Sequence, residues 1–137
     1  MLLSAPAIIL TAAVTLLAVL ISIAFAIHVA RSRIRVGVDA PAMSGPRELE
    51  YALRIQGNTV EMLVIFLPSL WLAALYFPGW AAPILGLIWC AGRILYAFVY
   101  GDRAARFPGF ALTIFPTLTL MFLAAIGVFN AWVASSA

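Results

Sequence analysis

The chain has 137 residues, of which 66% are hydrophobic and only 9% are charged, and its mean hydropathy is +1.13. Soluble domains use about 45–50% apolar and about 25% charged residues, so this composition excludes an ordinary soluble domain and indicates a surface that faces lipid. The net charge of +3 does not indicate a nucleic-acid-binding protein, because such an apolar chain has no soluble basic face to present.

Four apolar segments are predicted to be transmembrane helices, at about residues 6–30, 47–77, 80–100 and 109–132. Residues 31–47 and 101–108 are predicted to be loops, because charges, Pro and Gly gather there. Pro78-Gly79 leaves a very short turn, so the second and third segments are expected to pack as an antiparallel hairpin. The predicted fold class is an all-α integral membrane four-helix bundle, a single domain over residues 1–137.

The charges predict the orientation of this bundle. All eight cations are Arg, and they lie between Arg31 and Arg106. Most of them lie in the two charged loops. The positive-inside rule therefore predicts that loops 31–47 and 101–108 are cytoplasmic and that both termini lie outside. The first segment has no preceding positive charge, which is typical of a retained helix rather than a signal peptide.

Polar side chains inside the second segment mark a candidate site. Arg54, Asn58 and Glu61 are spaced i, i+4, i+7, so they share one stripe of a helix. A charge within a membrane segment costs about 2.5–3.5 kcal/mol even on insertion scales, so such residues indicate function by default.

The third segment repeats this spacing with Arg93, Tyr96 and Tyr100. If the two stripes face each other, they form a polar cleft that opens to the cytoplasm. Arginines suit carboxylates and Glu61 suits an ammonium group, so the cleft would fit a small zwitterion. The alternative is an Arg93–Glu61 ion pair that only locks the bundle.

Metal chemistry is not predicted. Cys90 and His28 are the one cysteine and the one histidine, and no spacing of metal ligands surrounds either of them. The cluster of Arg31, Arg33 and Arg35 is interpreted as lipid-headgroup anchors or as ligand contacts.

Residues 50–61 (EYALRIQGNTVE) and 66–71 (FLPSLW) resemble the second-helix signature of the MAPEG family, the membrane-associated proteins of eicosanoid and glutathione metabolism. Residues 86–89 (GLIW) and 92–96 (GRILY), followed by Tyr100, are similar to its third helix. The resemblance covers about residues 25–125 and indicates a microsomal glutathione S-transferase-like member of bacterial type.

This resemblance implies a homotrimer with sites between neighbouring subunits, glutathione bound near the cytoplasmic face, and an apolar co-substrate that arrives from the bilayer. Arg31 would reach the site from the adjacent subunit, and Gln56 would act through a different subunit face. By position, the implied glutathione-binding residues are Arg31, Arg54, Gln56, Asn58, Glu61, Arg93, Tyr96 and Tyr100.

The family's thiol-activating arginine follows the third helix, and Arg106 is the nearest match, with Arg103 as its rival. Two departures are informative: Met62 stands where synthase-like members have a Tyr, and Ser32 replaces the second of two adjacent arginines. Both favour a general transferase or peroxidase over a leukotriene synthase.

The predicted function is therefore a membrane-bound glutathione transferase or peroxidase in a bacterial inner membrane, with a role in detoxification. It would join glutathione to a hydrophobic electrophile or reduce a lipid hydroperoxide, without a metal and without nucleic acid. The alternative is a non-catalytic lipid-binding or scaffold protein of the same fold. A small four-helix exporter is disfavoured, because the first segment carries no membrane carboxylate.

Overall fold

The computed structural model describes residues 5–77 and 79–136, except for the side chains of residues 103 and 105. The described residues form four helices: α1 (Ala5–Val36), α2 (Arg47–Tyr76), α3 (Ala81–Phe98) and α4 (Arg103–Ser135). Each contains a stretch long and apolar enough to cross a membrane. The expectation of an all-helical bundle with four membrane spans is confirmed.

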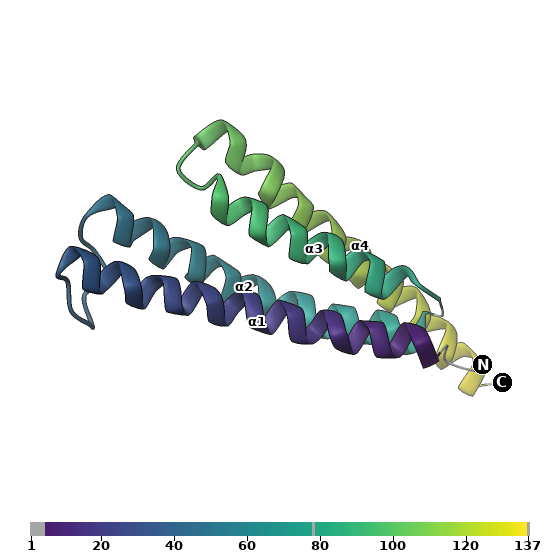
Figure 1. The fold of residues 1–137 in the computed structure, drawn as a ribbon. Helices are drawn as coiled ribbons and strands as arrows, with labels where there is room; N and C mark the ends of the chain where they lie inside the picture. The colour runs from purple at the N-terminus through teal and green to yellow at the C-terminus, as the bar shows by residue number, and fades with distance from the viewer. Residues whose placement is uncertain (1–4, 78, 137) are drawn as a thin grey trace.

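The helices are arranged as two pairs, α1 with α2 and α3 with α4 (Figure 1). The pairs converge at the end that carries both termini and separate at the opposite end, where the α1–α2 and α3–α4 connections lie. An apolar core joins the pairs, and at its centre the rings of Phe66 and Trp89 stack in parallel with their centroids 4.2 Å apart.

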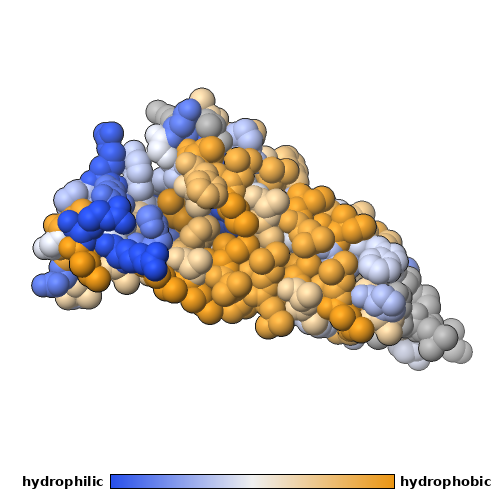
Figure 2. Space-filling model, viewed as in Figure 1, coloured by the Kyte–Doolittle hydropathy of each residue, from blue (hydrophilic) through white to orange (hydrophobic). Residues whose placement is uncertain are grey.

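The outer surface suits lipid over most of its length. Large apolar side chains such as Leu16, Val64 and Phe122 are strongly exposed. Hydrophobic residues cover the middle of the molecule, whereas hydrophilic residues gather at the end that carries the α1–α2 connection (Figure 2). This distribution, together with the four apolar helices, describes an integral, multi-pass membrane protein.

Two helix ends differ from the prediction, and both bring arginines onto helices. α1 continues beyond residue 30 to Val36, where the Val38 N–H donates to the Arg33 carbonyl at 3.1 Å and Gly37 takes a positive φ. This is a Schellman-type helix end, for which Gly37 rather than the first arginine gives the stop signal. α4 begins at Arg103 rather than near residue 109, because the Asp102 carboxylate accepts a hydrogen bond from the Ala104 N–H at 2.9 Å and caps the helix.

Close packing between α3 and α4 fixes the geometry of the second pair. A Cβ atom at Gly92 would lie 2.7 Å from the Cβ of Leu112 and 2.8 Å from its backbone. Small residues at such points allow helix backbones to approach closely within a membrane. The residues that follow α3 and begin α4 are therefore held side by side at the open end of the bundle.

Candidate functional site

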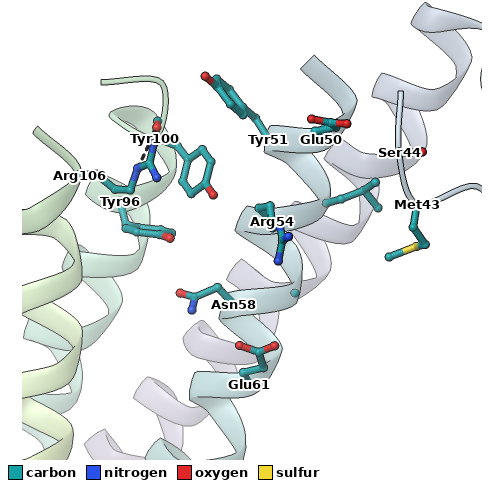
Figure 3. A pocket seen from close by; sticks show the side chains of 12 residues that line it. Met43, Ser44, Glu50, Tyr51, Arg54, Asn58, Glu61, Tyr96, Tyr100 and Arg106 are labelled. Atoms are coloured by element: carbon teal, nitrogen blue, oxygen red, sulfur yellow. Dashed lines mark hydrogen bonds between the residues drawn. The ribbon is translucent and has the colours of Figure 1, made fainter. Parts of the chain in front are cut away.

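A cavity of about 810 Å³ opens where the two helix pairs separate. Its volume lies within the range of roughly 300–1,000 Å³ that is typical of small-molecule sites. Figure 3 shows side chains of α2 on one wall and of α3 and α4 on the other. The lining residues are Met43, Ser44, Glu50, Tyr51, Leu53, Arg54, Gly57, Asn58, Glu61, Tyr96, Tyr100 and Arg106.

The α2 wall carries the predicted polar stripe. Arg54, Asn58 and Glu61 all line the cavity, and their side chains project from successive turns of the helix (Figure 3). Arg54 and Glu61 are exposed, whereas Asn58 is half-buried. Because neither charged group makes an ion pair within the described part of the chain, both are free to bind a ligand of opposite charge.

The opposite wall is aromatic. Tyr100 packs edge-to-face against Tyr96 and against Tyr51 of α2, with ring centroids 5.3 Å and 5.2 Å apart. Both Tyr96 and Tyr100 line the cavity, as the sequence predicts for a cleft between the two helices. These contacts hold the phenol groups in fixed positions and leave an apolar ring surface beside the polar stripe.

Arg106 brings a second cation to the cavity from the first turns of α4. Its Nε donates to the Tyr100 carbonyl at 3.1 Å, and its Cζ lies 4.2 Å from the centroid of the Tyr100 ring. Neither Nη group donates to any described residue, so these donors can bind a ligand. The side chain of Arg103, the rival thiol-activating residue, lies outside the described residues.

Arg93 is placed differently from the expectation that it would be a donor within the cleft. Its side chain is 0% exposed and does not line the cavity. Both Nη groups donate to Asn58 Oδ1 at 3.0 Å, and one of them also donates to Thr59 Oγ1 at 3.0 Å. The alternative of an Arg93–Glu61 ion pair is therefore not formed, because the guanidinium bonds to two neutral groups of α2 instead.

Two other predicted residues do not line the cavity of a single chain. Arg31 is exposed on α1, and Gln56 is half-buried on a different face of α2 from Arg54 and Asn58. Their predicted contacts involve a neighbouring subunit or a different subunit face, so both contacts stay predictions.

Six lining residues were not predicted: Met43, Ser44, Glu50, Tyr51, Leu53 and Gly57. Glu50 had a detectable signal, because it stands four residues before Arg54 and so extends the same stripe by one turn. Met43 and Ser44 belong to the α1–α2 connection, and no periodicity in the sequence brings that segment to the cavity.

The chemistry of the cavity is that of a zwitterion site. Two cations, Arg54 and Arg106, share it with two carboxylates, Glu50 and Glu61. The charges balance within the cavity, so a ligand needs both anionic and cationic groups to satisfy them. Among the described residues, no group of three His, Cys, Asp or Glu side chains could hold a metal ion.

Comparison with known proteins finds relatives that match most of the chain. The sequence profile of the MAPEG family matches residues 9–126. An uncharacterized protein of Synechocystis is 46% identical over 102 residues, covering 74% of each chain. Microsomal glutathione S-transferase 2 of Homo sapiens is 38% identical over 125 residues, covering 90% of this chain and 85% of that protein.

Leukotriene C4 synthase of Cavia porcellus is also similar, at 39% identity over 95 residues, which cover 69% of this chain and 63% of that enzyme. The family profile spans most of the chain, including α2, α3 and the polar stripe of α2. The family resemblance noted from the sequence motifs is thus confirmed, and the chain belongs to the MAPEG family.

Proposed function

We propose that this protein binds glutathione in the cavity between α2 and α3–α4 and transfers its thiolate to a hydrophobic electrophile. The family and the relatives support a glutathione-dependent, transferase-type function at the membrane. The observation that carries the specific proposal is the arrangement of Arg54, Glu61 and Arg106 around one cavity of suitable volume, where none of the three makes an ion pair with a described residue.

Glutathione matches the cavity group by group. The tripeptide has two carboxylates, an ammonium group, two peptide units and a thiol. Arg54 is assigned to a carboxylate, since a guanidinium can donate two parallel hydrogen bonds to it. Glu61 is assigned to the ammonium group, and the phenols of Tyr96 and Tyr100 supply further donors.

Arg106 is the proposed thiol-activating residue. A guanidinium stays protonated and cannot accept the thiol proton, so this proton leaves to water in the open cavity. The positive charge then stabilises the thiolate and lowers the pKa of the bound thiol. With an aryl halide, the sulfur forms a carbon–sulfur bond, the carbon–halogen bond breaks, and halide leaves with the electron pair.

The rest of the proposal concerns the assembly. A homotrimer would allow Arg31 and Gln56 to approach glutathione through a neighbouring subunit, and membrane lipids would surround it. The apolar co-substrate, an electrophile or a lipid hydroperoxide, would enter from the bilayer. The connections at residues 37–46 and 99–102 would face the cytoplasm, since all eight arginines lie in or near the half of the bundle that carries them.

Direct binding is the first test. We expect reduced glutathione to bind the purified protein in detergent by titration calorimetry, and to be consumed when an aryl halide is added. Binding without transfer to any aryl halide or hydroperoxide would favour the non-catalytic lipid-binding or scaffold alternative. Absence of glutathione binding would remove the proposal altogether.

A further inference from the structure

Arg93 lies directly behind the wall of the cavity. Its guanidinium is fully buried between two residues that do line the cavity, Asn58 and Tyr96. It donates to Asn58 Oδ1 through both Nη groups at 3.0 Å, and its Cζ lies 4.6 Å from the centroid of the Tyr96 ring. Arg93 therefore touches the site from behind while it is shielded from any ligand in the cavity.

These bonds fix the orientation of the Asn58 amide. A guanidinium has only donors, so the Asn58 oxygen must face it, because the opposite orientation would set N–H groups against N–H groups. The amide nitrogen is then turned away from Arg93, and its two N–H groups donate to no described residue. Since Asn58 lines the cavity, these N–H groups are the atoms that it can offer to a ligand.

We propose that Arg93 is a positioning residue that makes Asn58 a hydrogen-bond donor and not an acceptor towards glutathione. This inference rests on the proposed function. It assigns an oxygen acceptor of the ligand, a carboxylate or a peptide carbonyl, to the position opposite Asn58. The ammonium group is excluded from that position and must bind to Glu50 or Glu61, the two carboxylates of the cavity.

The replacement Asn58→Asp separates this role from a purely structural one. A carboxylate accepts the Arg93 bonds at least as well as an amide does, so the α2–α3 link is kept and the melting temperature should not fall. The atom that faces the ligand, however, changes from a donor to an anionic acceptor. We expect affinity for glutathione to fall about tenfold or more. The substitution removes the N–H groups that would donate to the ligand oxygen, and it places a carboxylate that repels this oxygen in their position.

A double-mutant cycle tests whether Arg93 acts through Asn58. Arg93→Gln should weaken glutathione binding in the native background and have no further effect in an Asn58→Ala background. The matched control is Thr59→Val, which removes the other acceptor of the same guanidinium without altering the cavity wall. It should lower the melting temperature and leave affinity within about twofold, because Asn58 remains held by both Nη groups.

The outcomes distinguish this inference from the function on which it rests. If the unaltered protein does not bind glutathione, the proposed function fails. If it does bind, and Asn58→Asp binds glutathione equally well or more tightly, the inference alone is overturned. Additive losses in the cycle would likewise overturn it, since they would mean that Arg93 affects binding independently of Asn58. Should Arg93→Gln not fold, the Asn58→Asp result decides by itself.

Discussion

Removal of the Arg106 guanidinium should abolish most thiolate formation while glutathione still binds. Arg106 is half-buried at an open cavity, so its effective dielectric environment lies between the protein surface and bulk water. For a thiolate sulfur about 4 Å from the guanidinium, Coulomb's law gives an attraction of about 1 kcal/mol in water and of about 4 kcal/mol near a protein surface. An intermediate value of about 2 kcal/mol corresponds to a decrease of about 1.5 units in the pKa of the thiol.

This decrease has a measurable consequence at neutral pH. A free thiol with a pKa of about 8.5 is about 3% ionised at pH 7, and a decrease of about 1.5 units makes it about half ionised. Arg106→Ala should therefore reduce the ultraviolet thiolate absorbance of bound glutathione about fifteenfold at pH 7. The loss should be smaller at higher pH, where the free thiol ionises by itself.

Two controls sharpen this test. Arg106→Lys keeps the positive charge and should retain a large part of the thiolate signal, although it loses the Nε donor that bonds to the Tyr100 carbonyl. Arg103→Ala tests the rival arginine at the start of α4. An unchanged thiolate signal in Arg106→Ala, together with its loss in Arg103→Ala, would refute the reasoning from the Arg106 geometry.

Three further predictions concern binding and stability. Arg54→Ala and Glu61→Gln should each weaken glutathione binding about ten- to a hundredfold by calorimetry, since each removes one charge-assisted contact; equal affinity in both would show that the ligand binds elsewhere. Gly92→Ala should destabilise the protein by about 1–3 kcal/mol in thermal unfolding, because the new methyl group meets the Leu112 backbone. Arg35→Ala should change stability by less than about 1 kcal/mol, since its ion pair with Glu48 is exposed on both sides; a larger loss would indicate that this ion pair is part of a wider network.

Much of the fold could be predicted from the sequence, because lipid imposes strong constraints on it. The length of the apolar segments predicted the four helices, and α3 begins soon after α2 ends, although Pro78 of the predicted turn lies outside the described residues. The errors at Val36 and Arg103 have a common cause. Charged residues were read as loop, yet arginines are good helix formers whose long side chains reach water from a helix end.

The candidate site was predicted in part. Helical periodicity gave the stripe of Arg54, Asn58 and Glu61, because one helix alone determines which of its residues share a face. The position of Arg93 could not be obtained in this way. Whether its guanidinium enters the cavity or lies behind the wall depends on which α2 atoms meet it, and only the packing of α2 against α3 decides this.

The burial of Arg93 bears on why position 58 carries a neutral amide and not a carboxylate. A buried guanidinium without a carboxylate partner is costly, and among the described residues two neutral oxygens and the Tyr96 and Trp89 rings offset that cost. Aspartate at position 58 would compensate the charge better and strengthen the link between α2 and α3. It would also present an anion to the carboxylates of glutathione. Asparagine is thus the residue expected at position 58 if ligand binding, and not the stability of the bundle, determines which residue stands there. The variant Asn58→Asp should therefore melt at the same temperature as the native protein or at a higher one.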